Sequence, residues 1–131
     1  MHINDLVKTA KGLTRITDLF SGYNGVTITD QSSVVVNNHV FCYVKCSGSI
    51  TFSANGACIA LHIEDESLVP SIVNIISTRV NSNSSGQVYA SANAIIDPNG
   101  YVSIYGPVNT TYGNSSYPWT TTGGMYFDYW L

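Results

Sequence analysis

Side chains capable of catalysis or metal binding are few in this sequence and lie far apart. His39 and His62 each stand in a strand-like segment with apolar neighbours, and Glu64-Asp65-Glu66 is the densest acidic run. Two histidines can ligate a metal ion, and carboxylates with nearby carbonyls can hold calcium. Single histidines in strands are more often structural, and three acidic residues where a strand ends more often form a solvated turn. The sequence therefore predicts no metal site and no cofactor.

The sequence contains no catalytic signature. It has no G-x-S-x-G nucleophile elbow, no H-E-x-x-H zinc motif and no glycine-rich phosphate loop. Glycosidase chemistry needs two carboxylates about 5–9.5 Å apart across a cleft. Beyond Glu66 only Asp97 and Asp128 are acidic, and Asp97 stands in a predicted turn. We therefore expect a protein that is not an enzyme.

The composition best suited to ligand binding lies in residues 109–122, which combine Asn, Ser, Thr and Gly with three aromatic residues. A neutral sugar packs its C–H face on an aromatic ring while its hydroxyls bond to amides and hydroxyls nearby. The same rings also suit packing, so a saccharide site and a packed loop both remain open. The alternating run 125–131 favours a core or interface strand instead. The candidate ligand-binding residues are Asn109, Tyr112, Asn114, Tyr117 and Trp119.

The three cysteines are predicted to be buried free thiols. Cys42 and Cys46 lie four residues apart in one predicted strand, which places their Cα atoms roughly 13 Å apart. A disulfide needs a Cα separation of less than about 7 Å. With Cys58 as the only other cysteine, the spacing also fails the usual zinc patterns. Free thiols indicate folding in a reducing compartment.

Composition excludes several classes of protein. The 131 residues are 44% apolar but only 10% charged, with a net charge of −3. Five Lys and Arg residues cannot form a surface that follows a phosphate backbone, so no nucleic-acid partner is expected. No run of 18 apolar residues exists, and the first ten residues lack the pattern of a signal peptide, so neither membrane insertion nor secretion by that route is expected. With 16 Ser, 12 Thr and 12 Asn, neutral polar groups are expected to keep the surface soluble.

The first twenty residues carry a helix-like pattern. Mostly apolar residues recur at spacings of three and four, at Ile3, Leu6, Ala10, Leu13, Thr17 and Phe20. This spacing is that of the a/d seam of a short coiled coil. We therefore predict a helical neck over residues 1–20. In a seam, Leu6, Ala10, Leu13 and Phe20 would mediate self-association. A single amphipathic helix that packs on its own domain fits the same spacing.

From residue 21 onward the pattern changes to that of β-strands. Turn signals separate the predicted strands, and the strongest is Asp97-Pro98-Asn99-Gly100, which predicts a hairpin. About eight short strands at this spacing predict an all-β fold, an antiparallel β-sandwich or jelly roll over residues 21–131. The β-prone runs span residues 26–29, 40–46, 49–53, 58–63, 72–80, 87–96, 101–105 and 125–130.

Three segments, together with the final aromatic strand, carry a resemblance to a known family. Glu66-Ser67-Leu68-Val69-Pro70 precedes a β-rich stretch, and residues 94–106 form a hairpin pattern of apolar residues, turn, Gly and alternating apolar residues. Residues 34–44 read as a short strand, a turn and a long strand, and the chain ends in an aromatic strand. In these features it resembles the C-terminal head domains of phage and prophage tail-fibre and baseplate proteins. Ser71-Ile72 stands where that family often has Arg-Pro.

The resemblance implies a homotrimeric, receptor-binding head. Such a head binds host cell-surface saccharide or protein without catalysis, contacts other tail or baseplate proteins, and resides in the virion after assembly in the bacterial cytoplasm. Two other classes stay open. One is a structural scaffold domain of the tail or baseplate with the same fold and no ligand, and the other is a bacterial carbohydrate-binding or hydrolytic module. The fold alone does not choose among them, because function resides in a site.

Overall fold

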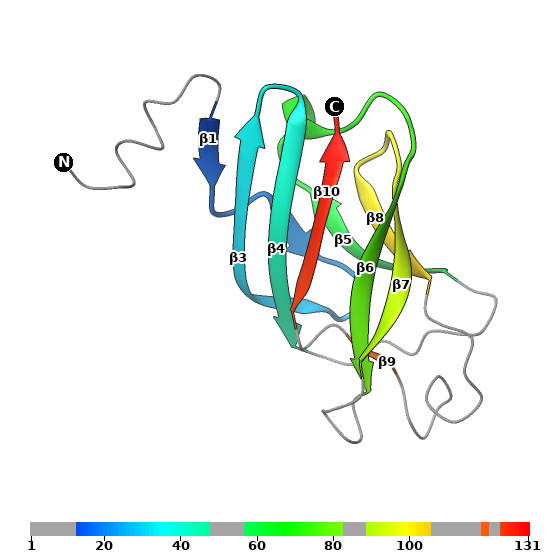
Figure 1. Ribbon diagram of the computed structural model, residues 1–131. Coiled ribbons are helices and arrows are strands. Elements are labelled where there is room, and N and C mark those ends of the chain that lie inside the picture. Colours follow the sequence, from blue (N-terminus) through cyan, green and yellow to red (C-terminus); the bar gives the residue numbers. More distant parts are fainter. Residues whose placement is uncertain (1–12, 48–56, 83–88, 106–118, 121–123) are drawn as a thin grey trace.

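Two antiparallel β-sheets pack face to face in this protein (Figure 1). The computed structural model describes residues 13–47, 57–82, 89–105, 119–120 and 124–131. Across these residues the only helical element is a single 3₁₀ turn, and no helix is long and apolar enough to cross a membrane. The all-β sandwich predicted from the sequence is therefore confirmed.

The first sheet has four strands, and the second has five plus a short edge strand. The first sheet consists, in spatial order, of β1 (Leu13–Ile16), β3 (Thr27–Val36), β4 (His39–Ser47) and β10 (Met125–Trp130). The second consists of β2 (Phe20–Gly22), β5 (Ala57–Ile63), β8 (Tyr101–Tyr105), β7 (Tyr89–Ile96), β6 (Asn74–Ser82) and the edge strand β9 (Trp119–Thr120). The 3₁₀ turn η1 spans Glu66–Leu68. Strands β8 and β10 begin and end at the predicted residues, whereas the strand predicted over 49–53 lies outside the described residues.

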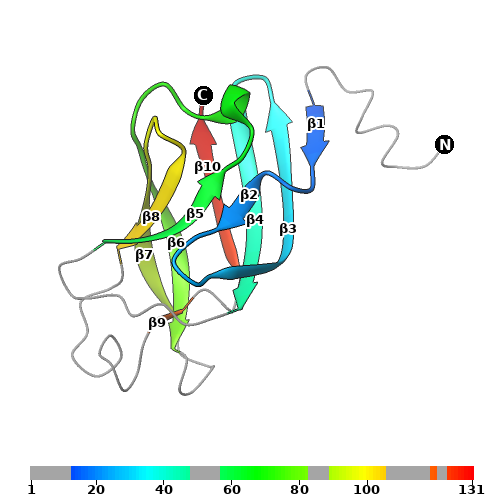
Figure 2. The same cartoon turned by 180° about the vertical axis from the view of Figure 1, so that it is seen from behind.

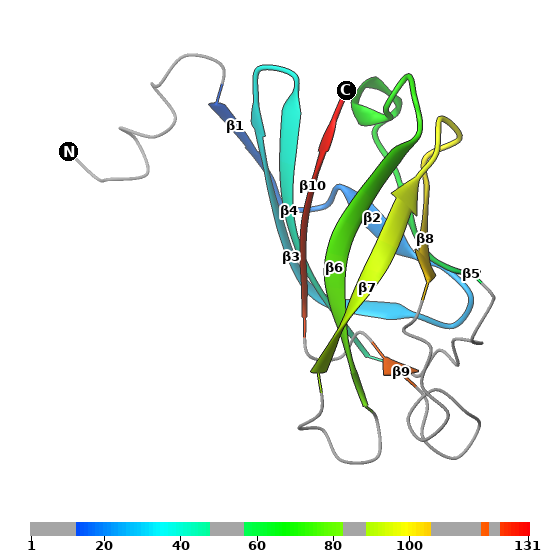
Figure 3. The same cartoon turned by 45° about the vertical axis from the view of Figure 1, so that its right-hand side comes forward.

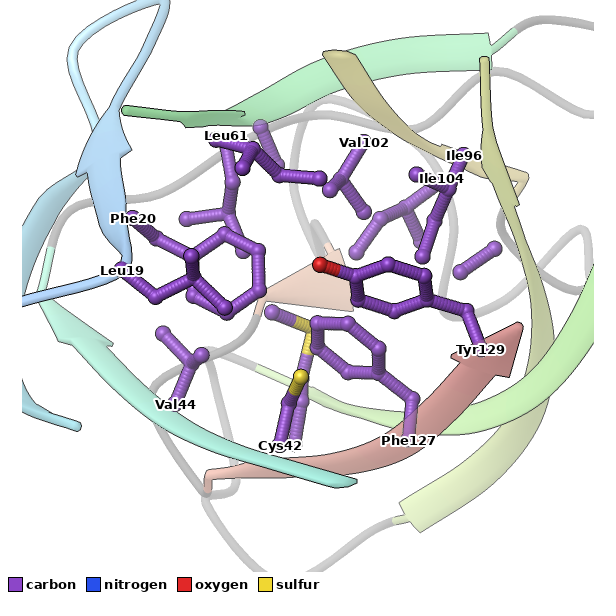
Figure 4. Packing of buried hydrophobic residues seen from close by; sticks show 14 of the residues in the cluster. Leu19, Phe20, Cys42, Val44, Leu61, Ile96, Val102, Ile104, Phe127 and Tyr129 are labelled. Carbon is purple, nitrogen blue, oxygen red and sulfur yellow. The ribbon is translucent and has the colours of Figure 1, made fainter. Parts of the chain in front are cut away.

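The hydrophobic core lies between the two sheets. Because side chains alternate between the two faces of a strand, every second side chain points into this core. Strand β10 shows strict alternation of buried and exposed residues, and β4 follows the same period. Burying one large aliphatic side chain contributes about 1.5–3 kcal/mol, so this alternation determines which face of each strand is inside. The core side chains include Cys42 and Val44 of β4, Phe127 and Tyr129 of β10, and Leu61, Ile96, Val102 and Ile104 of the second sheet (Figure 4).

All three cysteines are free thiols, as predicted. Cys42 and Cys46 are buried among the core side chains, and Cys58 is half-buried. Burial raises the pKa of the Cys42 thiol to about 12. This thiol therefore stays protonated near neutral pH and acts as a small apolar side chain.

The predicted N-terminal helix is wrong for residues 13–20. Residues 13–16 form β1, which pairs with β3, and Phe20 begins β2, which pairs with β5. Leu19 and Phe20 are both buried, and the ring centroid of Phe20 lies 5.6 Å from that of Phe127. In a helix, consecutive side chains point in different directions. Here the chain passes from β1 in the first sheet to β2 in the second, and both side chains are buried in the core between the sheets. Thr14 and Thr17 also lower the helix propensity of the segment.

Two of the four predicted oligomerisation residues, Leu13 and Phe20, lie in β-strands rather than on a helix. Phe20 packs in the core of its own chain, so its ring is not presented on a helical seam. Leu13 lies in β1, paired with Val36. Leu6 and Ala10 lie outside the described residues.

The hairpin predicted at residues 97–100 is confirmed. The Asp97 carboxylate oxygen Oδ1 accepts hydrogen bonds from the backbone N–H groups of Asn99, at 2.8 Å, and Tyr101, at 3.3 Å. The backbone N–H of Gly100 donates to the Asp97 carbonyl at 2.9 Å. Asp97 is therefore committed to the turn between β7 and β8, as the sequence indicated.

A hydrogen bond across the sandwich closes one end of the core. The Tyr129 hydroxyl of β10 donates to the backbone carbonyl of Leu68, at the end of η1, at 2.8 Å. Burial raises the pKa of Tyr129 well above its usual range, so the hydroxyl remains a donor. Asp65 caps the same turn, because its carboxylate accepts from the backbone N–H of Ser67 at 2.9 Å.

Replacing Tyr129 with Phe will lower the free energy of unfolding by about 1–3 kcal/mol, because the Leu68 carbonyl is left buried without its donor. Urea denaturation followed by circular dichroism measures the change. The control is Tyr126→Phe on the exposed face of the same strand, which is expected to change stability by less than about 0.5 kcal/mol. Equal stability of Tyr129→Phe and the native chain would show that this bond does not hold the end of the core.

Candidate functional site

The outer face of the four-stranded sheet carries a group of exposed aromatic side chains. The strand register aligns Tyr126 with Tyr43, Asp128 with Phe41, and Trp130 with His39. Phe41, Tyr126 and Trp130 are 47%, 62% and 57% exposed, although side chains of this size are usually covered. We call this group the aromatic platform; it consists of His39, Phe41 and Tyr43 of β4 with Tyr126, Asp128 and Trp130 of β10.

One half of the aromatic platform surrounds a histidine–carboxylate pair. The His39 ring stacks on Phe41, with centroids 4.4 Å apart and an interplanar angle of 18°, and its centroid lies 3.9 Å from that of Trp130. The His39 Nε2–H donates to the Asp128 carboxylate oxygen Oδ2 at 2.5 Å. The Asp128 side chain remains 55% exposed, so its carboxylate can still accept hydrogen bonds from a ligand.

The other half of the aromatic platform is the Tyr43–Tyr126 pair. The two ring centroids lie 4.8 Å apart, and the Arg79 guanidinium carbon lies 5.9 Å from the Tyr126 ring centroid. Gly124 has a φ of +84°, and a Cβ there would lie 3.1 Å from the Tyr43 ring. The positive φ favours glycine at this position, and any side chain there would push against the Tyr43 ring.

The free edge of β10 is held by β6, which lies beside it where the two sheets approach (Figures 1 and 3). The Asn74 side chain donates to the Trp130 carbonyl at 3.1 Å and accepts from the Trp130 backbone N–H at 3.0 Å. Farther along, the Arg79 Nε–H donates to the Gly124 carbonyl at 3.2 Å. These bonds satisfy edge groups of β10 and fix the strand that carries half of the aromatic platform.

A second group of polar and aromatic side chains lies on the outer face of the other sheet. The Ser21 hydroxyl donates to the Glu64 carboxylate oxygen Oε1, and the His62 Nδ1–H contacts the same oxygen at 3.4 Å. These two bonds, that of Ser21 first, lower the pKa of Glu64, which is therefore ionised at neutral pH. We call this group the His62 cluster; it consists of Ser21, Tyr23, His62, Glu64 and Tyr101.

The His62 cluster lacks the arrangement of a nucleophilic triad. In such a triad the histidine lies between the hydroxyl and the carboxylate and takes the hydroxyl proton. Here the Ser21 hydroxyl bonds directly to the Glu64 carboxylate instead. The chemistry available to the cluster is hydrogen bonding rather than activation of Ser21.

The two histidines, and two of the three acidic residues at positions 64–66, are hydrogen-bonded to other groups of the protein. His39 belongs to the first sheet and His62 to the second, and each pairs with a carboxylate. Glu64 bonds to Ser21, and Asp65 caps η1. Over the described residues, no group of three or more His, Cys, Asp or Glu side chains is arranged to hold a metal ion.

A shallow depression of about 430 Å³ also lies on the surface. Among the described residues it is lined by Thr17, Ile28, Thr29, Asp30 and Gln31, none of which is aromatic. The Gln31 side chain is already engaged, because it bonds to the backbone N–H and carbonyl of Phe20 at 3.0 and 2.9 Å. The depression therefore offers less to a ligand than the aromatic platform.

The ligand-binding residues predicted from the sequence lie almost wholly outside the described residues. This holds for Asn109, Tyr112, Asn114 and Tyr117. Trp119 begins β9, where its backbone pairs with Ser82, and its side chain is not described. A saccharide site in this loop therefore stays a prediction.

Sequence reasoning missed the aromatic platform. It interpreted residues 125–131 as a core or interface strand; Met125, Phe127 and Tyr129 are buried in the core, whereas the alternate residues Tyr126 and Trp130 are exposed on the platform. The alternation of side chains along residues 125–130 could have indicated it. Aromatic residues stand at both odd and even positions, so a strand there cannot point all of them into one core.

Comparison with known proteins gives no match: no family model, no curated protein and no solved structure is significantly similar to this chain.

Replacing Asp128 with Ala will lower the free energy of unfolding by less than about 1 kcal/mol, because an ion pair with a largely exposed partner contributes little. Thermal and urea denaturation measure the change. A loss of several kcal/mol would instead show that the His39–Asp128 pair holds β4 and β10 together, and the variant would then be unsuitable for binding studies.

Proposed function

We propose that this chain is a non-catalytic receptor-binding head domain of a phage or prophage tail fibre or baseplate, and that its aromatic platform binds host cell-surface saccharide. The observation that carries the proposal is the set of exposed rings around the His39–Asp128 pair. The association with phage tails rests on the resemblance of three sequence segments.

The geometry of the aromatic platform suits a sugar ring. Exposed rings on a sheet face offer flat apolar area to the C–H face of a pyranose. The Asp128 carboxylate lies among these rings and accepts hydrogen bonds from sugar hydroxyls, while His39 holds it in place. Asp128 places a negative charge among the rings, where it repels an anionic ligand, whereas the Arg79 guanidinium lies 5.9 Å from the Tyr126 ring in the other half of the platform. A neutral polar ligand is favoured over a polyanion.

The segments that carry the resemblance meet at one end of the sandwich. The Tyr129 hydroxyl of the final aromatic strand bonds to the carbonyl of Leu68, in the Leu68-Val69-Pro70 segment. A Cβ at Gly100, in the turn of the β7–β8 hairpin, would lie 3.3 Å from the Val69 side chain. These segments therefore form one structural unit, which supports reading them together as a family pattern.

A scaffold role is the second candidate, and exposed aliphatic side chains favour it. Ile72, Val73 and Ile75 are 68%, 53% and 70% exposed. They flank Asn74, whose side chain bonds to the Trp130 backbone, so they lie at one end of the aromatic platform. Exposed aliphatic side chains suit a protein surface better than a sugar. This corner is suited to a sister subunit or to another tail or baseplate protein.

Replacing Trp130 with Ala will weaken binding to cell-surface saccharide by about tenfold or more, because one stacking ring is lost. A glycan array, followed by calorimetric titration of the best oligosaccharide, measures the effect. Tyr105→Ala serves as the matched control, since Tyr105 is an exposed aromatic residue on the other sheet, outside both the aromatic platform and the His62 cluster.

Three outcomes of the array separate the candidates. Loss of binding in Trp130→Ala alone supports the aromatic platform, whereas loss only in Tyr112→Ala and Tyr117→Ala would place the site in the loop of residues 109–122. Binding of no glycan and no host surface by the native chain would contradict a receptor-binding role and favour the scaffold.

The chain is proposed to form a homotrimer, so sedimentation at micromolar concentration will give a mass of about 42 kDa for a chain of 14.1 kDa. Ile75→Asp will shift the mass toward the monomer if the aliphatic corner lies between subunits, because a charge would be buried there. A native chain that sediments as a 14.1 kDa monomer would contradict the trimer.

A further inference from the structure

The second sheet, whose strands β2 and β5 lie in front of β10 in Figure 2, carries the His62 cluster on its outer face, on the side of the sandwich away from the aromatic platform. The strand register aligns Ser21 of β2, His62 of β5 and Tyr101 of β8 in one row across the sheet. Tyr23 follows β2 and Glu64 follows β5. Three strands thus bring five side chains with binding potential together without any contribution from the aromatic platform.

The backbone around the His62 cluster is held by hydrogen bonds from several elements. The Tyr23 N–H donates to the Ala60 carbonyl at 2.9 Å, beside a bulge in β5 between Ile59 and Leu61. The Glu64 N–H donates to the Leu19 carbonyl at 2.8 Å. A cluster held in this way loses little conformational entropy when it binds a ligand.

The three rings of the cluster form a continuous series. The Tyr23 and Tyr101 rings meet edge to face, with centroids 5.3 Å apart, and the Tyr101 and His62 centroids lie 4.8 Å apart. Tyr23 is 42% exposed, so part of its ring is open to solvent. This series presents an apolar surface next to the Glu64 carboxylate.

The polar atoms that face a ligand here are acceptors. Glu64 Oε1 is occupied by Ser21 and His62, whereas within the described residues Oε2 has no hydrogen-bond partner. In the tautomer that donates Nδ1–H to Glu64, the other ring nitrogen of His62, Nε2, is an acceptor. The His62 side chain is 32% exposed, and a Cβ at Gly100 would lie in van der Waals contact with Nε2, 3.4 Å away.

We propose that the His62 cluster is a second saccharide site that takes a neutral pyranose. The sugar stacks its C–H face on Tyr23 and Tyr101 and donates two hydroxyl hydrogens, one to Glu64 Oε2 and one to His62 Nε2. Acidic sugars and phosphorylated glycans are rejected, because the ionised Glu64 carboxylate of the cluster repels them.

This site goes beyond the proposed function, because it does not require the aromatic platform to bind anything. If both sites bind, one chain contacts two glycan segments on opposite faces. Weak binding at each would then combine through effective concentration into stronger attachment to a dense glycan surface.

Backbone amide chemical shifts of the ¹⁵N-labelled native chain test the proposal. The probes are the methyl glycosides of glucose, galactose, N-acetylglucosamine and N-acetylgalactosamine, with methyl glucuronide as the anionic comparison, each titrated to high millimolar concentration. At least one neutral glycoside is expected to shift the amides of Ser21, His62 and Tyr101, and the glucuronide is expected to leave them unchanged. Absence of these shifts with every neutral glycoside would overturn the proposal, as would an equal response to the glucuronide.

Variants assign the shifts to the cluster. Tyr101→Ala and Glu64→Gln are each expected to weaken the response about tenfold, because one removes a stacking ring and the other a charged acceptor. Glu64 is exposed, so Glu64→Gln remains informative if Tyr101→Ala fails to fold. Tyr105→Ala, on the same strand and face, is expected to have no effect. An unchanged response in Glu64→Gln would overturn the proposal.

The same titration separates this proposal from the proposed function. Shifts at the His62 cluster that persist in Trp130→Ala support a second site, whatever happens at the aromatic platform. Shifts confined to residues of the aromatic platform support the proposed function and overturn the second site.

Discussion

Strand β10 pairs with β4 in a single register, and both the core and the aromatic platform depend on it. Its inward residues Met125, Phe127 and Tyr129 fill the space between the sheets, and its outward residues Tyr126, Asp128 and Trp130 form half of the platform. A slip by one residue would exchange these two sets and bury a carboxylate. The Tyr129–Leu68, Asn74–Trp130 and His39–Asp128 bonds all oppose such a slip, because each joins β10 to a different element.

The two outer faces of the sandwich repeat one chemical arrangement. Each face carries a histidine paired with a carboxylate and flanked by aromatic rings: His39 and Asp128 with Phe41 and Trp130 on one face, and His62 and Glu64 with Tyr101 and Tyr23 on the other. Both arrangements offer hydrogen-bond acceptors beside apolar rings. They suit a neutral hydroxylated ligand, and the low charge of the chain agrees with such a ligand.

The sequence predicted the strands better than it predicted the site, for a physical reason. Local alternation and turn residues specify an element such as β8 or the turn at Asp97, and both are found where expected. The predicted helix is wrong over residues 13–20, because the burial of Leu19 and Phe20 is decided by the rest of the fold rather than by local spacing. His39 and Asp128 lie 89 residues apart, so only the pairing of β4 with β10 brings them together.

Stacking of a ligand on Trp130 can be measured by tryptophan fluorescence, because the chain has only two tryptophans. In Trp119→Phe, Trp130 is the only remaining tryptophan. Titration with the oligosaccharide selected on the array is expected to shift its emission to shorter wavelength and to reduce its quenching by acrylamide. A response that persists in Trp130→Phe and is absent from Trp119→Phe would contradict the account and place the ligand at Trp119.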